Sequence, residues 1–262
     1  DDRAAPTMAI EPTEEDLAAA QRSFEGVLAP LDRSGRCVYY QDRNRRWPFH
    51  AGAEGHALLT DLLGAAARLV ALSDARLRGL AEGSRLRREG EAIYARKPNR
   101  KAEDVTWSQD EYAHLGLQRE YMRFKSVQRF TETWALLERA RAAGCFRAAE
   151  GAEEGARCRV ASLGGGPGFE LHAVRLFFQR NFPEVTLELI SLDLAETWGP
   201  YCEALGVAFA PWDVRDGDGL LARTGGPVDY AIISYVLHHY MANEHCAKWL
   251  GRWLSGPPQP AA

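Results

Sequence analysis

The stretch that decides the fold is Val160-Ala161-Ser162-Leu163-Gly164-Gly165-Gly166-Pro167-Gly168-Phe169-Glu170. An apolar strand runs into a glycine-rich turn, and a helix follows the turn. Glycine lets a ligand approach the backbone closely, and the first turn of the helix offers N–H groups to an anion. A dinucleotide loop would need glycine at Phe169, and a P-loop needs Gly-Lys-Ser/Thr. The stretch predicts a ligand-binding loop of another kind, with a ligand-free strand-to-helix turn as the alternative.

Strand-like and helix-like segments alternate on both sides of this loop. Strands are expected at 158–163, 186–192, 207–210 and 228–235, each followed by a helical segment. Such alternation favours an α/β fold with a doubly wound, mostly parallel sheet. We expect this domain to cover residues 158–262, and its ligand to bind at the carboxyl ends of the strands, where the strand order reverses.

The first half of the chain, residues 1–146, is expected to be a separate helical domain. Helix starts are indicated at Thr13-Glu14-Glu15-Asp16 and at the capping box Ser108-Gln109-Asp110-Glu111. Helices are expected at 55–72 and 74–88, and a long amphipathic helix at 117–143, before Gly144. The small and polar residues 147–157 mark the domain boundary.

Composition indicates a soluble globular chain. Hydrophobic residues make up 46% and charged residues 26% of 262 residues, and a net charge of −4 gives no general attraction to nucleic acid or an anionic membrane. The alanine- and leucine-rich segment 57–72 contains Asp61, Gly64 and Arg68, so we expect a core helix and no membrane span. No signal peptide is visible at the N-terminus, although a processed precursor would look the same. Five cysteines without a CxxC spacing favour a reducing, intracellular compartment and no metal site.

The glycine spacing at 164, 166 and 168 resembles the first motif of the class I S-adenosylmethionine-dependent methyltransferases, with Ser162 in the place of the usual acid. Further segments stand in the order of that family: Asp193 ends the second strand, Pro211-Trp212-Asp213 ends the third, and residues 229–239 resemble its D-h-h-h-s-x-x-h-L-H-H segment. The resemblance covers about residues 158–254. It implies a Rossmann-like sheet, S-adenosylmethionine as cofactor, and methyl transfer to an unidentified acceptor.

The resemblance also implies roles for single residues. Asp193 would hold the ribose hydroxyls and Asp213 the adenine amino group. Asp193 could instead be a solvated strand end or a helix N-cap, and Asp213 could instead cap a short helix. The methionine carboxylate would face the helix start at Gly168 and Phe169. Tyr121 and Arg123, on the helix before the sheet, are implied as further contacts. The implied cofactor-binding residues on the sheet are Ser162, Gly164, Gly165, Gly166, Pro167, Gly168, Asp193, Leu194, Asp213, Val214 and Ser234.

Methyl transfer requires mainly that the acceptor and the methyl carbon are held in line. A nitrogen or oxygen acceptor must also lose a proton, and His238, His239 and Tyr235 are the candidate catalytic residues for that step. A structural role for the histidines is an equal alternative. Ser234-Tyr235-Val236-Leu237 replaces the Asn/Asp-Pro-Pro-aromatic pattern of amino-methylating enzymes. Small molecules, protein side chains and RNA positions other than adenine N6 remain as acceptors.

The segment 85–129 is the one basic region of the sequence. RNA could bind there through Arg96, Lys97, Arg100 and Lys101, with bases stacked on Tyr94, Trp107, Tyr112, Tyr121 and Phe124. A solvated helix face above an aromatic core stripe explains the same pattern and is preferred.

Two departures from the family favour a second hypothesis. Ser162 lacks a carboxylate, and residues 229–262 leave no room for the later strands of the family's sheet. We therefore expect a sheet truncated after its fourth strand, with an exposed edge that a partner protein, a fold-back of residues 36–41 or further sequence would cover. The second hypothesis is a methyltransferase-like scaffold subunit without catalytic activity.

Overall fold

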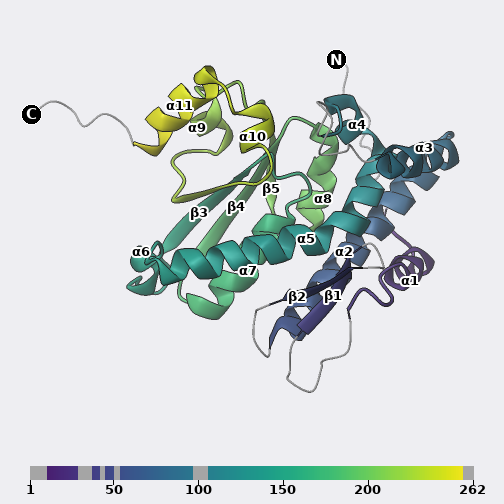
Figure 1. Cartoon of the computed structure of the whole chain (residues 1–262), viewed down its shortest axis with the longest axis horizontal. Helices are drawn as coiled ribbons and strands as arrows, with labels where there is room; N and C mark the ends of the chain where they lie inside the picture. Colours follow the sequence, from purple (N-terminus) through teal and green to yellow (C-terminus); the bar gives the residue numbers. More distant parts are fainter. Residues whose placement is uncertain (1–10, 29–36, 42–44, 50–53, 97–105, 256–262) are drawn as a thin grey trace, which may run out of the picture. The chain divides into compact units, whose positions relative to one another are not determined.

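The computed structural model describes residues 11–28, 37–41, 45–49, 54–96 and 106–255 (Figure 1). They belong to two compact units, the first within Asp1–Lys97 and Asp110–Gln128 and the second within Pro98–Gln109 and Arg129–Ala262. The units divide inside the long helix α5 (Leu115–Ala142), whereas the sequence placed the domain boundary at residues 147–157. Each unit is described separately.

The first unit is mainly helical. Its helices are α1 (Glu14–Arg22), α2 (Gly55–Arg78), α3 (Gly83–Ala95), most of α4 (Gln109–Ala113) and the first half of α5. The expected break at residue 73 is wrong, because α2 continues through the buried Ser73 and ends before Gly79. An antiparallel hairpin of β1 (Cys37–Gln41) and β2 (Arg45–Phe49), which was not predicted from the sequence, completes the described part.

Close backbone contact and one ion pair hold α5 to its neighbours in this unit. A Cβ atom on Gly90 of α3 would lie 2.0 Å from the carbonyl carbon of Gly116, so both helices need glycine at this crossing. The guanidinium of Arg119 on α5 pairs with the carboxylate of Asp74 on α2, with 2.6 Å between Nε and Oδ1. The buried stripe predicted for α5 is confirmed by Tyr121 and Val127 in this unit.

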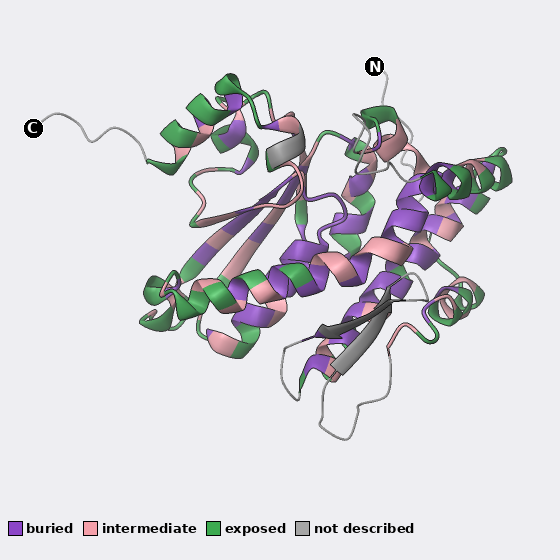
Figure 2. Cartoon of the chain, viewed as in Figure 1, coloured by how far each residue is buried: buried purple, intermediate pink, exposed green. Residues whose placement is uncertain are grey.

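Helix α2 is the one described helix that is long and apolar enough to cross a membrane, by length and composition alone. Half of its most apolar window is buried inside the protein. Leu62, Leu69 and Val70 are fully buried (Figure 2). This burial is the property expected of a core helix.

The start of α1 confirms the predicted helix signal. The Thr13 hydroxyl accepts a hydrogen bond from the Asp16 amide at 3.2 Å, and the Asp16 carboxylate accepts one from the Thr13 amide at 2.7 Å. This is a reciprocal capping box, which satisfies two helix-end donors. Asp16 also pairs with Arg78 of α2, and the hydrogen bonds from this arginine hold the pKa of the carboxyl well below its usual range.

Replacing Thr13 with alanine is expected to destabilise α1 by about 1 kcal/mol, because the Asp16 amide loses its acceptor. Amide hydrogen exchange of α1 measures this change. Thr60→Ala is the matched control, since Thr60 lies exposed on α2 and its hydroxyl donates to the His56 carbonyl within that helix. Equal exchange rates for α1 in both variants would show that the capping box contributes nothing.

The second unit contains a four-stranded sheet of β3 (Arg157–Leu163), β4 (Thr186–Asp193), β5 (Ala208–Pro211) and β6 (Tyr230–Ile233). All of its pairings are parallel, in the order β5-β4-β3-β6, which confirms the predicted α/β class. Besides the second half of α5, its helices are α6 (Arg147–Glu150), α7 (Phe169–Asn181), η2 (Glu196–Trp198), α8 (Gly199–Ala204), α9 (Leu220–Arg223), α10 (Leu237–Tyr240) and α11 (Glu244–Leu254).

Strand β3 lies where the strand order reverses. It pairs with β4 on one side and with β6 on the other, and Leu163 is in register with both Leu192 and Ile233. The last residue of β4, Asp193, is in register with Pro211 of β5. The carboxyl ends of the strands therefore meet at one edge of the sheet, where the connecting loops can form a site.

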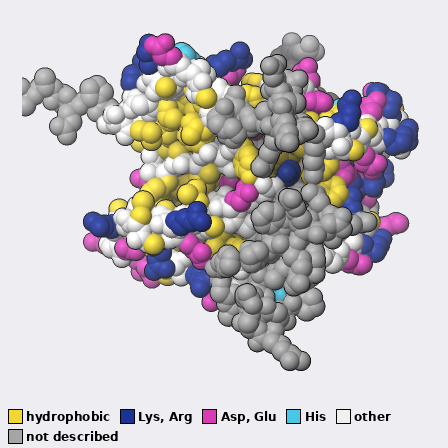
Figure 3. All heavy atoms as spheres, in the orientation of Figure 1, with side chains coloured by type: hydrophobic (Ala, Val, Ile, Leu, Met, Phe, Trp, Pro, Cys, Tyr) yellow, Lys and Arg dark blue, Asp and Glu magenta, His cyan; other side chains and the backbone are white. Residues whose placement is uncertain are grey.

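Apolar packing fixes the loops at this edge. The rings of Trp212, after β5, and Trp249, on α11, meet edge to face with 5.8 Å between centroids. The Trp249 indole donates a hydrogen bond to the Val214 carbonyl at 3.1 Å, which holds the turn after β5. Beside α10 and α11 apolar side chains also reach the surface (Figure 3), among them Leu237 and Leu254.

Candidate functional site

The loop between β3 and α7 has a backbone that needs its glycines. Gly164, Gly166 and Gly168 have φ angles of 70°, 50° and 89°, in the left-handed region that favours glycine. A Cβ atom on Gly164 would lie 2.2 Å from Cγ2 of Val236, and one on Gly165 would lie 2.5 Å from Oγ of Ser191. Gly168 is the N-cap residue of α7. The motif therefore forms a tight, largely buried turn of backbone directly before a helix.

Hydrogen bonds hold this glycine loop against β4 and α8. The amides of Gly164 and Gly165 both donate to the Leu192 carbonyl, at 2.7 and 3.1 Å. The Gly166 carbonyl accepts from the Ser191 hydroxyl and the Cys202 thiol, each at 3.1 Å. These hydrogen bonds fix the conformation of the loop.

Asp193 lies beside the loop, as the sequence predicted for neighbouring parallel strands. Its Oδ2 accepts from the Gly166 amide and its Oδ1 from the Ala195 amide, each at 3.0 Å. Burial raises the pKa of the Asp193 carboxyl to about 6, although these backbone donors act in the opposite direction. Leu194 follows with an exposed side chain, 43% accessible.

Ser162, the candidate residue on the strand before the motif, lies under the loop. The residue is 1% exposed, and its hydroxyl has no hydrogen-bond partner among the described residues. It is in register with Ser191 on β4, and a Cβ atom on Gly165 would lie 2.7 Å from its Oγ. The space below the loop is therefore filled by small hydroxyl side chains, and no carboxylate is present at position 162.

The turn after β6 carries a second group of side chains. Tyr235 has a φ of 65° and is the one non-glycine residue with positive φ in the described ranges. Its hydroxyl donates to a carboxylate oxygen of Glu132 at 2.6 Å. The guanidinium of Arg129 lies 3.7 Å above the Tyr235 ring and donates to the Ser234 hydroxyl at 3.1 Å. Such backbone strain is concentrated at functional sites in proteins.

Glu170 joins this group to the glycine loop. It is the second residue of α7, its side chain is 5% exposed, and its Oε1 lies 3.8 Å from Nε of Arg129. Burial raises the pKa of the Glu170 carboxyl, and the charge of Arg129 opposes the shift. Arg129, Glu132 and Glu170 were not among the site residues predicted from the sequence. The sequence did contain a signal for Glu170: it is a charged residue in the first turn of an apolar helix, two positions after the last glycine of the motif.

Asp213 and Val214 lie at the end of β5 and have contacts of their own. The Asp213 carboxylate accepts from the Arg215 amide at 2.9 Å and from its guanidinium, whose hydrogen bonds lower the pKa of the carboxyl. Within the described range 106–255 no helix follows Asp213 directly, so the alternative of a helix cap is wrong, and the acid closes a turn. Val214 packs against the apolar cluster that contains Trp212 and Trp249.

The remaining predicted residues are not brought to the loop by the described contacts. His238 and His239 lie on α10, and their side chains are outside the described residues. Tyr121 and Arg123 belong to the first unit, where Tyr121 is buried and the Arg123 guanidinium lies 3.7 Å from Glu120. Their roles stay predictions.

The basic segment is described in part. Lys97, Arg100 and Lys101 fall outside the described residues, and Tyr94, Trp107 and Tyr121 are buried. Among the described residues, no group of three or more His, Cys, Asp or Glu side chains could hold a metal ion.

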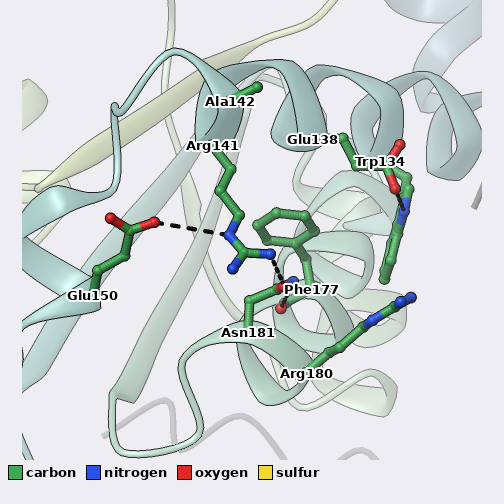
Figure 4. A pocket seen from close by; sticks show the side chains of 8 residues that line it. All are labelled: Trp134, Glu138, Arg141, Ala142, Glu150, Phe177, Arg180 and Asn181. Atoms are coloured by element: carbon green, nitrogen blue, oxygen red, sulfur yellow. Dashed lines mark hydrogen bonds and ion pairs between the residues drawn. The ribbon is translucent and has the colours of Figure 1, made fainter.

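A separate pocket of about 440 Å³ lies between α5 and α7 (Figure 4). Arg141 reaches into it and donates to the Asn181 side chain at 2.5 Å, and its Nε lies 3.8 Å from the Glu150 carboxylate. The lining residues are Trp134, Glu138, Arg141, Ala142, Glu150, Phe177, Arg180 and Asn181. Its two arginines face two glutamates, so the pocket has no excess of either charge.

Comparisons of this chain with protein-family models, curated proteins and solved structures give no match. The fold and the site define a class: a parallel α/β unit with a glycine loop and an acid at the point where the strand order reverses. A function is therefore inferred from the residues of that site alone.

Proposed function

We propose that the second unit is a Rossmann-like, doubly wound domain that binds S-adenosylmethionine and transfers its methyl group to an acceptor. The observation that carries the proposal is the hydrogen bond from the Gly166 amide to the Asp193 carboxylate. It joins the G-x-G-x-G loop after one strand to the acid after the next strand, at the edge where parallel α/β sheets bind nucleosides. A loop or an acid alone would be weak evidence.

The residues present fit this ligand. Each Asp193 oxygen has a further lone pair beside its backbone donor, so the carboxylate can accept both ribose hydroxyls. Burial strengthens such hydrogen bonds to the ionised acid. Gly164 and Gly165 allow the close packing of the loop on Val236 and Ser191, and the lack of a side chain at Gly166 would let the ligand approach the backbone there. Asp213, Val214, Leu194 and Ser234 stay in the proposal as residues of the surrounding loops.

The chain would act mainly by positioning. S-Adenosylmethionine supplies a methyl carbon bonded to a sulfonium, which leaves as a neutral thioether when the acceptor's electron pair forms the new bond. The acceptor must lose a proton, and we propose that Tyr235 takes it while its own hydroxyl proton passes to Glu132, to which that hydroxyl donates a hydrogen bond. His238 and His239 remain proposed alternatives. Holding the reactants in line can supply about 7–11 kcal/mol of the rate acceleration.

The acceptor class is proposed more broadly. RNA bound through residues 85–129, protein side chains and small molecules all remain in the proposal, in a reducing intracellular compartment. β6 has β3 as its one strand neighbour among the described residues. Its other edge is the place where we propose that a partner protein or further strands complete the truncated sheet.

A methyltransferase-like scaffold is the second candidate. The observation that favours it is Ser162, a buried hydroxyl without a partner among the described residues, at the position where the family has an acid. A scaffold would keep the fold and need no ligand contact from this position.

Calorimetric titration of the purified chain with S-adenosylhomocysteine tests the proposal. We expect a dissociation constant in the micromolar range, and no heat of binding for NADH at the same concentrations, because Phe169 replaces the third glycine of a dinucleotide loop. A folded chain, shown by circular dichroism, that binds NADH but not S-adenosylhomocysteine would contradict the proposal. A folded chain that binds neither ligand would favour the scaffold.

A further inference from the structure

Arg129 and Glu170 form a nearly buried ion pair beside the first turn of α7, the helix that follows the glycine loop. Their side chains are 11% and 5% exposed, and 3.8 Å separates Nε of Arg129 from Oε1 of Glu170. A direct charge-assisted hydrogen bond has a distance of about 2.7–2.9 Å, so this pair is loose. Removing two charges from water is unfavourable unless their contact is close, so a loose buried pair is a weak source of stability.

The arginine is held from its other side. Its guanidinium donates to the Ser234 hydroxyl and stacks on the Tyr235 ring, at the residue with positive φ. The glutamate is fixed by its place in the first turn of α7, directly after the N-cap Gly168. Two opposite charges are therefore held on separate elements, at a distance that a small ligand can change.

We propose that Arg129 and Glu170 are the groups that bind the α-amino acid end of the ligand, Arg129 its carboxylate and Glu170 its ammonium. The inference rests on the proposed function, because a sulfonium amino acid nucleoside carries such a zwitterion. Binding would give each of the two charges an oppositely charged partner on the ligand, so neither buried charge would be left without one. In this proposal the nucleoside end of the ligand lies by Gly166 and Asp193, whose amide and carboxylate are bonded to each other.

This assignment differs from the expectation that the carboxylate faces the start of α7. The Glu170 carboxylate already occupies the first turn of that helix, and its negative charge would repel a second carboxylate there. The assignment also explains how the site could bind the ligand's ammonium group without an acid at position 162. Glu170, eight residues further along the chain, supplies the negative charge that Ser162 lacks.

Two ligands and three variants test the inference by calorimetry. S-Adenosylhomocysteine carries the zwitterion, and 5′-methylthioadenosine carries the same nucleoside and sulfur without it. We expect Arg129→Met and Glu170→Gln each to weaken S-adenosylhomocysteine binding about 10- to 100-fold, which is the usual effect of deleting one partner of a charged hydrogen bond. The affinity for 5′-methylthioadenosine should change by less than about threefold. Arg141→Met, on the same helix and paired with Glu150, is the control and should alter neither affinity.

The results of these titrations distinguish a failure of this inference from a failure of the proposed function. Retained binding of 5′-methylthioadenosine by the Arg129 and Glu170 variants shows that they fold and that the loss belongs to the zwitterion. An equal loss for both ligands would overturn the inference, since it would give the pair a merely structural role. Unchanged S-adenosylhomocysteine binding in both variants would also overturn it. If the wild-type chain binds neither ligand, the proposed function itself fails.

Discussion

Replacing Gly166 with alanine is expected to abolish measurable binding of S-adenosylhomocysteine while the chain stays folded. The φ of 50° makes alanine unfavourable by about 1–2 kcal/mol. The new Cβ atom meets little of the protein itself, since its nearest neighbour is Cε2 of Trp198 at 3.8 Å. The methyl group therefore makes one ordinary van der Waals contact, with the Trp198 ring, and needs no shift of the protein. In the proposed site the ligand that bonds to Asp193 lies against this glycine, whose amide donates to the same carboxylate at 3.0 Å, so the added methyl group would take part of the ligand's space.

The expected loss of affinity is at least about 100-fold, which corresponds to about 3 kcal/mol of binding free energy. Gly155→Ala is the matched control. Gly155 has a φ of 82°, a Cβ atom on it would have nothing within 4 Å, and it precedes β3 at the opposite end of the sheet. Both variants should lose similar stability in urea unfolding, and only Gly166→Ala should lose binding. Wild-type affinity in Gly166→Ala would show that the ligand does not contact the glycine loop.

The α/β architecture could be predicted from the sequence because its signals are local. Each strand is a short apolar run bounded by glycine or polar residues, and each is followed by a helix-length segment. Parallel strands end at one edge, so the loop at 164–168 and Asp193 could be expected at the same edge of the sheet. The structure confirms the parallel α/β sheet, and at that edge the Gly166 amide donates a hydrogen bond to Asp193.

The other half of the site could not be found in this way. Arg129 and Ser234 are 105 residues apart in the chain, and on a long amphipathic helix a charged residue is usually solvated. The bond between them depends on how α5 packs beside β6 within the second unit, which no local pattern encodes. The hairpin of β1 and β2 was missed because its residues lie within a region whose other segments have helical spacing.

Asp193→Asn is expected to remove ligand binding and, in the free chain, to remove a pH dependence of stability. The pKa of Asp193 in the folded chain is about 6, above the value of about 4 for an unfolded aspartate. The folded state therefore binds the proton more tightly, and lowering the pH from 7.5 to 5 stabilises the folded chain through this residue by about 1 kcal/mol. The asparagine variant cannot take up this proton. Urea unfolding of both proteins at the two pH values measures the difference.

Glu170, whose pKa burial also raises, acts in the same direction and is present in both proteins. The charge of Asp193 contributes to this rise, so Asp193→Asn also reduces the pKa shift of Glu170, and both effects lower the pH dependence of the variant. The acids with lowered pKa values, Asp16 and Asp213 among them, destabilise the fold only at lower pH. Lowering the pH should weaken ligand binding although it stabilises the free chain through Asp193. Protonation removes an acceptor for the ribose hydroxyls, so wild-type affinity for S-adenosylhomocysteine should fall about tenfold between pH 7.5 and 5. A wild-type affinity that is constant over this pH range would exclude Asp193 as the residue that binds the ribose. The reason is that the ionised and the protonated carboxyl group cannot bind the two hydroxyls equally well.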